Sequence, residues 1–294
     1  MMSIEVKPLT PTFGAEIKGV DLASSSAADF DEVLEIFSEY GVIFFRDQDK
    51  LSEEAHINLA RRFGEIHIHP AARGKGDDPS GLLKMKTNKE SKVAAGNRWH
   101  SDVSCDEFPP YASILQLHET PSAGGDTVFA SLCAAYDALS SRMKTMLDGL
   151  SALHSGEEPF RHLFKFENHQ EGQGWPENDH PLIREHLPSG RPTLFVDREF
   201  TKKINELPKD EGKALLDFLF SHIERVDFQC RFQWTPNAIA IWDNRCVLHH
   251  ALWDYWPEQR SGCRVTTVGE KPVAWRLSDH TGTQKERSSI RLTA

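Results

Sequence analysis

The strongest constraint on the fold is an alternation of apolar and polar residues in the C-terminal half. From Val226 to Trp234, apolar side chains occupy every second position, with Asp, Gln and Arg between them. Side chains of a β-strand point alternately to opposite faces, so this period of two predicts a strand with one buried face. Shorter apolar runs, separated by turn residues, follow at 238–242, 247–251 and 263–268. Several short strands in succession favour a jelly-roll-like barrel that is packed by helices.

The N-terminal half supplies most of the helices. Ser26 and Asp29 form a capping-box pattern before an apolar stripe, and Gly41 is placed to end that helix. The run Val42–Phe45 is continuously apolar, which is typical of a buried strand. Further helices are predicted at 52–63, 134–150 and 209–225, and further strands at 15–20, 99–103 and 111–117.

We expect a single domain from residue 1 to residue 280. Two polar segments interrupt it: a loop at 73–98, and a segment at about 155–192 that is rich in Gly, Pro, Asn and His. A connection as long as 155–192 is usually a functional lid or disordered, so we interpret it as an inserted loop or lid. The basic tail at 281–294 is predicted to be flexible.

The composition limits the classes of partner. The net charge of -10 argues against nucleic acid or an anionic membrane as the main partner. The five cysteines are scattered and form no Cys-x-x-Cys pair, which favours reduced thiols in a cytoplasmic protein. Residues 1–19 hold no apolar run suited to a signal peptide, and no stretch is long enough to span a membrane. We expect a homo-oligomer, a dimer or tetramer, that binds a small anionic organic molecule.

The stretch Trp99–Val103 contains the first candidate metal ligands. On a strand, His100 and Asp102 would share a face. Together with one distant His they would form the two-His-one-carboxylate triad that holds non-haem Fe(II) and leaves three coordination positions open. The chain has fourteen His, so an isolated His-x-Asp arises easily by chance. His67 and His69 form a competing pair, although for His67 a surface or capping role is the favoured interpretation.

The stretch Trp242–His250 offers the third ligand. Either His249 or His250 could supply it, since strand alternation prevents both from facing the same way. Arg264 lies in an apolar strand, where an unpaired guanidinium is costly, and Arg260 can share its face. Each arginine could bind an anionic ligand or a carboxylate of the protein, and the residues alone leave both possibilities open.

Taken together, these motifs resemble the taurine dioxygenase family of Fe(II)- and 2-oxoglutarate-dependent oxygenases. The resemblance runs from about Val6 to Pro272. It implies a mostly β fold with flanking helices, a double-stranded β-helix, and iron held by His100, Asp102 and His249. The residues that carry it are Trp99-His100-Ser101-Asp102, Gly124-Gly125-Asp126-Thr127, Trp242-Asp243-Asn244-Arg245, and the spacing of His249, Arg260 and Arg264.

The resemblance also implies roles for the residues around the metal. Arg260, assisted by Thr127, would bind the distal carboxylate of 2-oxoglutarate, whose keto acid end takes two open positions while O2 takes the third. The products would be succinate, CO2 and a hydroxylated substrate. Retention of Asp102 argues against the halogenating relatives, which lack the carboxylate. The positions matched to substrate binding are His69, Phe160, Phe200 and Arg264.

Two departures from the taurine enzymes bear on the substrate. Ala72 stands where they have Tyr, and Gly96 stands where they have Asn, so we expect an anion that is bulkier or less polar than taurine. Candidates are another sulfonate, an alkyl sulfate ester or an aryloxyalkanoate, each of which would fragment after hydroxylation next to the heteroatom. Phe160 and Phe200 could instead be core residues.

Two function classes compete with the oxygenase. A zinc-dependent hydrolase could use His100, Asp102 and His249 to activate water, but it would leave Arg260 and Thr127 without a role. A non-catalytic jelly-roll binding protein would have no use for an intact triad.

Overall fold

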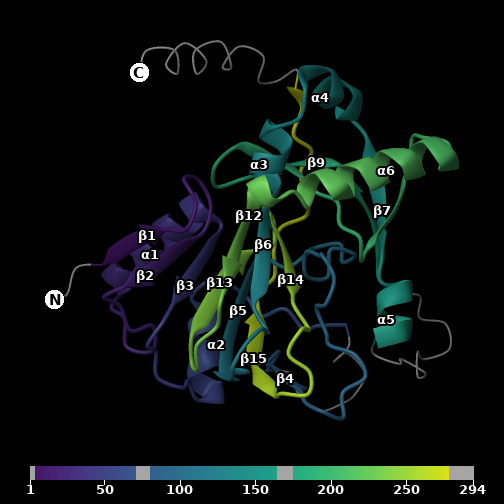
Figure 1. The fold of residues 1–294 in the computed structure, drawn as a ribbon. Helices are drawn as coiled ribbons and strands as arrows, with labels where there is room; N and C mark the ends of the chain where they lie inside the picture. The colour runs from purple at the N-terminus through teal and green to yellow at the C-terminus, as the bar shows by residue number, and fades with distance from the viewer. Residues whose placement is uncertain (1–3, 71–79, 164–174, 278–294) are drawn as a thin grey trace.

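A computed structural model describes residues 4–70, 80–163 and 175–277. Two antiparallel sheets pack face to face and form a jelly roll, as the alternation predicts (Figure 1). Phe44 of one sheet stacks on Phe232 of the other, with ring centroids 4.1 Å apart. No helix within the described ranges is long and apolar enough to cross a membrane.

The larger sheet has seven strands and the facing sheet has three. All strand pairs in them are antiparallel except β2 with β3. The larger sheet runs in the order β1 (Glu5–Pro8), β2 (Ala15–Lys18), β3 (Val42–Phe45), β13 (Ile239–Asp243), β5 (Ala112–Glu119), β15 (Arg260–Thr266) and β4 (Leu83–Thr87). The facing sheet runs β12 (Gln229–Phe232), β6 (Thr127–Ser131) and β14 (Val247–Ala251).

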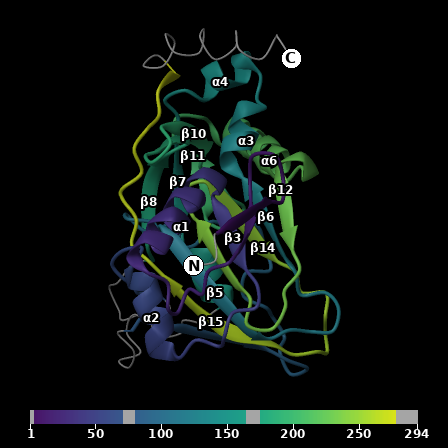
Figure 2. The same ribbon diagram turned by 90° about the vertical axis from the view of Figure 1, so that its left-hand side faces the viewer.

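Two helices cover the outer face of the larger sheet, α1 (Ala27–Tyr40) and α2 (Glu53–Arg61), as Figure 2 shows. The capping box of Ser26 and Asp29 and the left-handed Gly41 after α1 are confirmed. The apolar stripe of α1 packs in one core cluster with strand residues such as Ile43 and Ile241. Burial of these stripes, more than helix propensity, stabilises the two helices.

Three of the other helices gather at one end of the sheets (Figure 1). With them lie two small sheets, and both sets contribute to a second core cluster. The three helices are α3 (Leu132–Asp137), α4 (Ser141–Leu147) and α6 (Lys209–Ile223), while α5 (Glu157–Leu163) lies apart from them. The small sheets are β11 (Thr201–Ile204), β7 (Ser151–Ser155) and β8 (Glu177–Pro181), and β10 (Arg191–Leu194) with β9 (Ile183–His186).

Two predicted elements have other bounds in the structure. The helix expected at 134–150 is split, since the side chain of Ser140 accepts the backbone N–H of Met143 and starts a new helix. The strand expected from Val226 begins only at Gln229. Residues Val226–Phe228 form a 3₁₀ turn, in which Arg225 is hydrogen-bonded to Asp227 and Val226 is 82% exposed.

The two predicted loops contain regular structure. The polar segment 73–98 holds β4, an edge strand in which Lys84 and Lys86 face outward between less exposed residues. Its two apolar residues were too few to reveal the alternation. The segment 155–192 holds α5, β8 and β9, so its described part is built into the sheets. The tail at 281–294 lies outside the described residues.

A glycine sets the contact between β15 and β5. The pairing shifts by one residue between Ser261 and Gly262, which marks a β-bulge. A Cβ at Gly262 would lie 2.2 Å from the carbonyl oxygen of Gln116, so only glycine lets the two backbones approach this closely. Arg260 and Arg264 stand two residues before and after Gly262 on the same face of β15.

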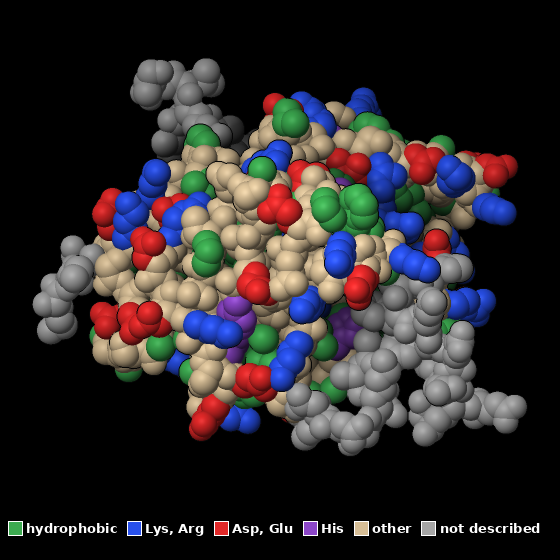
Figure 3. Space-filling view, turned by 60° about the horizontal axis from the view of Figure 1, so that its bottom comes forward, with side chains coloured by type: hydrophobic (Ala, Val, Ile, Leu, Met, Phe, Trp, Pro, Cys, Tyr) green, Lys and Arg blue, Asp and Glu red, His purple; other side chains and the backbone are tan. Residues whose placement is uncertain are grey.

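The surface carries charges of both signs. Figure 3 shows acidic and basic side chains interspersed, with histidines visible between them.

Buried neutral histidines should make the stability pH-dependent. Burial lowers the pKa of His56 to about 4, and its Nε2–H donates to the carbonyl oxygen of Ile114 at 3.0 Å. As the pH falls from 6.5 to 4, the unfolded chain takes up a proton that the folded chain refuses, so stability decreases over that window. His56→Gln keeps a donor but does not titrate. Urea unfolding should show a pH slope for the variant that is smaller by up to about 1.4 kcal/mol per pH unit. An unchanged slope would contradict the assignment.

Candidate active site

A two-residue bridge joins the halves of the site. His100 N–H donates to the carbonyl oxygen of His249 at 3.1 Å, and His249 N–H donates back to His100 at 2.9 Å. The prediction of a strand at 99–103 is wrong, because this bridge is isolated and the chain turns at Asp102. The ligands of the predicted triad are thus brought together by a bridge and a turn rather than by strand alternation.

The turn after Asp102 is strained. Val103 has φ of 42°, in the left-handed region that a β-branched residue rarely adopts. Such a conformation costs about 1–3 kcal/mol and persists only where the surroundings impose it. The Val103 side chain is held in an apolar cluster with Cys105, Phe160 and Phe200.

Three candidate ligand atoms converge. Asp102 Oδ1 lies 3.6 Å from His100 Nε2 and 3.9 Å from His249 Nε2, and all three groups are buried. The side chain of His250 instead contacts Asn97, with Nε2 and Oδ1 3.1 Å apart. Of the two adjacent histidines, His249 therefore joins the group, whose ligand atoms all lie within 4.8 Å of one another.

The histidine tautomer suits a metal. His100 Nδ1 lies 2.8 Å from the carbonyl oxygen of Arg98, and a carbonyl only accepts, so Nδ1 carries the proton and Nε2 keeps its lone pair. His249 Nδ1 is buried and finds no hydrogen-bond partner in the described structure. Two imidazole nitrogens and one carboxylate oxygen are the donor set that non-haem Fe(II) takes, so these residues fit the ion.

Electrostatics keep Asp102 ionised and His249 neutral, the states that a cation needs, but they favour the protonated form of His100. Burial alone would raise the pKa of Asp102, but Arg264 and the two histidines outweigh it and hold the pKa well below its usual range. Burial, together with His100, lowers the pKa of His249 well below its ordinary value. Burial disfavours the charged form of His100 as well, yet Asp102 raises its pKa. A bound metal ion would displace the proton that this raised pKa favours on His100.

A buried arginine lies beside the predicted hydroxyl partner. Arg260 donates from Nε to the Gly125 carbonyl oxygen at 3.2 Å and from Nη2 to Thr127 Oγ1 at 3.4 Å. Among the described residues it forms no ion pair with a carboxylate, because nearby Asp126 pairs with Arg231. Burial lowers its pKa. A buried guanidinium without a counter-ion calls for an anionic ligand.

The second arginine contacts the triad. Arg264 Nη1 donates to Asp102 Oδ1 at 2.6 Å, so in this structure the arginine pairs with a carboxylate of the protein. Its Nε is buried and has no hydrogen-bond partner in the described part of the chain. This nitrogen remains available to an incoming anion.

All these side chains line one cavity of about 260 Å³. It holds the candidate metal ligands, both arginines and Thr127, together with His69, Phe160, Phe200 and Gly96. Phe160 and Phe200 also belong to the apolar cluster around Val103, so they are at once core residues and walls. Ala72 lies outside the described residues.

Of the histidine pair before the loop, His67 is buried and His69 is half-buried. Burial, and then Arg264, lower the pKa of His69 to about 3, so it is neutral in the cavity wall. His67 is not a surface residue as predicted, since its Nε2 lies 2.7 Å from Asp106 Oδ2 and the side chain is enclosed.

Glu199 was missed by the sequence reasoning. It lines the cavity, and its buried Oε2 accepts no hydrogen bond from the described residues. This oxygen forms an ion pair with Arg98, whose Nη1 lies 3.7 Å away. The only hint in the sequence was its place directly before Phe200.

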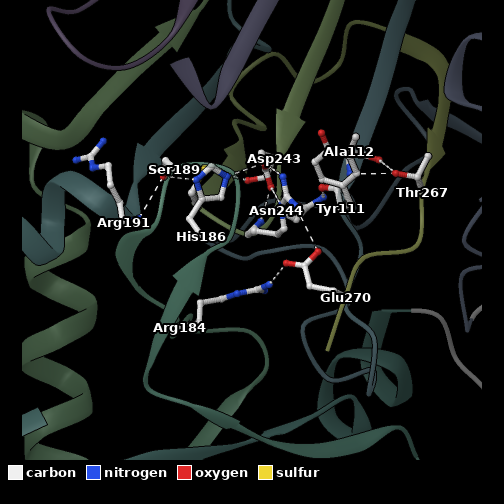
Figure 4. Close-up of polar contacts among 12 residues, drawn as sticks. Tyr111, Ala112, Arg184, His186, Ser189, Arg191, Asp243, Asn244, Thr267 and Glu270 are labelled. Carbon is white, nitrogen blue, oxygen red and sulfur yellow. Dashed lines mark hydrogen bonds and ion pairs between the residues drawn. The ribbon is translucent and has the colours of Figure 1, made fainter. Parts of the chain in front are cut away.

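A second cluster of potential ligands is structural. His186, Asp243 and Cys246 also lie close together. However, Arg245 donates to both carboxylate oxygens of Asp243, at 2.8 and 2.7 Å, and His186 Nε2 lies 3.1 Å from Oδ2 (Figure 4). Burial raises the pKa of the Cys246 thiol, so it stays protonated. The carboxylate is already fully paired and offers nothing to a metal.

Comparisons with known proteins agree with this geometry. The family model described as "Taurine catabolism dioxygenase TauD, TfdA family" matches residues 5–266. An alpha-ketoglutarate-dependent sulfonate dioxygenase of Saccharomyces cerevisiae is 33% identical over 286 residues, which cover 92% of this chain and 68% of the relative. An alpha-ketoglutarate-dependent sulfate ester dioxygenase of Pseudomonas putida is 33% identical over 281 residues, 92% of either chain. The solved structure of AAD-2 in complex with Mn(II) and N-oxalylglycine matches with a TM-score of 0.79 and 27% identity, covering 92% of this chain and 100% of that one.

The two adjacent histidines provide a matched test of the metal site. His249→Ala should weaken Mn(II) binding by more than about 100-fold, since even the hydrogen-bond partners of ligands contribute 10–100-fold. His250→Ala should leave the affinity within about twofold, because its side chain points to Asn97. Anaerobic calorimetric titration measures both. Equal losses in the two variants would refute the assignment of His249.

Proposed function

Because the chain belongs to the taurine catabolism dioxygenase TauD, TfdA family, we propose that it hydroxylates a small organic sulfonate or alkyl sulfate ester next to its heteroatom. The enzyme is an Fe(II)- and 2-oxoglutarate-dependent dioxygenase with a jelly-roll fold, and it uses Fe(II), 2-oxoglutarate and O2. Family membership decides against the zinc hydrolase and the non-catalytic binding protein.

One observation carries the proposal. A buried His100–Asp102–His249 triangle and a buried, carboxylate-free Arg260 line the same cavity. A hydrolase needs the first feature but has no use for the second. A keto acid that chelates a metal and carries a distal carboxylate needs both.

In the proposed mechanism, His100 Nε2, Asp102 Oδ1 and His249 Nε2 would hold Fe(II). Three protein ligands leave positions for the cosubstrate and for dioxygen. The chemistry that the bound group supplies is oxidative: 2-oxoglutarate and O2 become succinate and CO2, with one oxygen atom inserted into a substrate C–H bond.

Arg260 and Thr127 orient the cosubstrate in this proposal. The guanidinium holds the distal carboxylate, and the Thr127 hydroxyl can donate to the same group. Trp234 supports the arrangement, since its Nε1–H donates to Thr127 Oγ1 at 3.0 Å and directs the hydroxyl hydrogen elsewhere. Burial excludes water and strengthens the charge pairing.

Arg264 and His69 are the proposed binders of the substrate anion. The Arg264 Nε is uncommitted, and neutral His69 can donate one N–H. Phe160 and Phe200 form apolar walls that suit an alkyl chain. Gly96, with φ of 80°, has no side chain, and a Cβ at this position would already contact His100 and Ala251. These features support a substrate that is bulkier or less polar than taurine.

Hydroxylation at the proposed carbon makes the product unstable. An α-hydroxysulfonate loses hydrogen sulfite and an α-hydroxy sulfate ester loses hydrogen sulfate, and in both cases a carbonyl compound remains. An aryloxyalkanoate is the alternative substrate of the same chemistry and would release a phenol.

Two broader expectations belong to the proposal. A reducing, cytoplasmic setting is supported by the five cysteines, all of which are free thiols. A homo-oligomeric state, dimer or tetramer, is proposed as well, and sedimentation velocity would test it.

Substitution of the two arginines should have different effects on ligand binding. Arg260→Ala should weaken the binding of N-oxalylglycine, an isostere of 2-oxoglutarate, by about 30-fold or more. The reason is that truncating a buried charge partner costs about 2 kcal/mol or more. Arg264→Ala should mainly raise the KM of the anionic substrate. Calorimetry with Mn(II)-loaded protein measures the first effect, and succinate release measures the second. An identical loss of N-oxalylglycine affinity in both variants would contradict this division.

Substrate class is tested by succinate release with Fe(II), 2-oxoglutarate and a panel of anions. Taurine, longer alkanesulfonates, alkyl sulfate esters and aryloxyalkanoates should be compared at equal concentration. We expect a higher kcat/KM for an alkanesulfonate or alkyl sulfate ester than for taurine, by about 10-fold, as one or two extra buried methylenes would give. If taurine were the best substrate, the inference from Gly96 would be wrong.

A further inference from the structure

The two carboxylate oxygens of Asp102 have different surroundings. Oδ1 faces the two histidines and Arg264. Oδ2 accepts a hydrogen bond from Ser113 Oγ at 2.7 Å. The carboxylate therefore presents one oxygen to the centre of the triangle, while the other is held by β5.

The direction of the Ser113 hydrogen bond follows from its neighbours. Asn244 Nδ2, which has no lone pair, lies 2.9 Å from Ser113 Oγ, so the hydroxyl oxygen accepts there. Its single hydrogen is then free for Asp102 Oδ2 at 2.7 Å, the shorter choice over Thr266 Oγ1 at 3.4 Å. Ser113 is fully buried, where an unused hydroxyl would be costly.

Asn244 uses its entire hydrogen-bonding capacity. Its Oδ1 accepts from the backbone N–H of Asp102 and from Trp242 Nε1, both at 3.1 Å. Its Nδ2 donates to Ser113 and to the carbonyl oxygen of Tyr111, the latter at 3.1 Å. Two partners only donate and one only accepts, so a flipped amide would lose its bonds. Asn244 thus holds Asp102 by its backbone directly and by its carboxylate through Ser113.

The turn that carries Asn244 is anchored on its far side (Figure 4). Asp243 pairs with Arg245 and His186. Glu270 forms ion pairs with both arginines: its Oε2 lies 3.3 Å from Arg245 Nη1, and its Oε1 lies 2.8 Å from Nη2 of the buried Arg184. A side chain clamped from both sides can impose a geometry on the strained turn at Asp102.

We propose that Asn244 and Ser113 are positioning residues that make Asp102 a one-oxygen metal ligand. The relay runs from Asn244 Nδ2–H to Ser113 Oγ–H to Asp102 Oδ2. By occupying Oδ2 it keeps that oxygen off the metal and preserves the positions that the cosubstrate requires. The inference rests on the proposed function, since it needs a metal at Asp102 Oδ1.

Two variants test the relay. Ser113→Ala removes the hydroxyl. Asn244→Asp keeps the shape but replaces the donor Nδ2 by an acceptor, which would draw the Ser113 hydrogen away from Asp102. Ser104→Ala is the matched control, because Ser104 is equally buried two residues after Asp102 but bonds to His154 and Asp197.

The readouts are the visible absorption of bound Co(II), which reports ligand number and geometry, and the Co(II) affinity. Both test variants should change the spectrum and weaken binding about 10-fold, whereas Ser104→Ala should change neither. Thermal unfolding identifies a variant that does not fold, and the other variant then decides.

Failure of the relay differs from failure of the proposed function. Wild-type spectrum and affinity in the folded test variants would overturn the relay alone. A wild-type protein that binds no Co(II), or a His249→Ala variant that binds it as well as wild type, would overturn the metal site and the relay together.

Discussion

The backbone bridge between His100 and His249 is the interaction on which the site depends. It joins a loop to β14 by two main-chain hydrogen bonds, so the spacing of strand pairs sets the distance between the two imidazoles. The ring centroids lie 4.1 Å apart, and the His100 ring is oriented by its hydrogen bond to the carbonyl oxygen of Arg98. The bridge ends at one residue pair, and Asp102 already lies in the following turn. Its placement therefore falls to packing at Val103 and to hydrogen bonds from neighbouring strands.

The nitrogens around the two buried carboxylates differ in their pairing. Beside Asp243, both ring nitrogens of His186 and all three side-chain nitrogens of Arg245 have partners. In the cavity, by contrast, buried nitrogens of Arg264 and His249 have no partner within the described residues. A folded protein rarely leaves such groups unpaired without a ligand to receive them. The two clusters have similar residue types, but the first is structural and the second has nitrogens that are available to a ligand.

The parts of the fold that follow from local sequence patterns were predictable. The parts of the site that consist of rare residue types could be predicted as well. Alternation and capping signals gave the jelly roll and α1, and the chemistry of the ligands singled out His100 and Asp102, while their roles stay predictions. The choice between His249 and His250 came only from the resemblance, and in the structure it follows from the bridge. The link from Asn244 through Ser113 to Asp102 escaped notice because Ser113 lies 131 residues from Asn244 and 11 residues from Asp102 in the chain. No propensity reports contacts of that kind, and a left-handed valine runs against every local rule.

Gly262 fixes how closely β15 approaches β5. Any side chain there would push the strand away from β5, and Arg260 and Arg264 would move with it as one unit. The spacing of the Cα atoms of the two arginines is therefore a property of the backbone, whichever rotamers their side chains adopt. A substrate of different length cannot be accommodated by moving this strand. Room for it must come from the loops and from the aromatic walls of the cavity, Phe160 and Phe200.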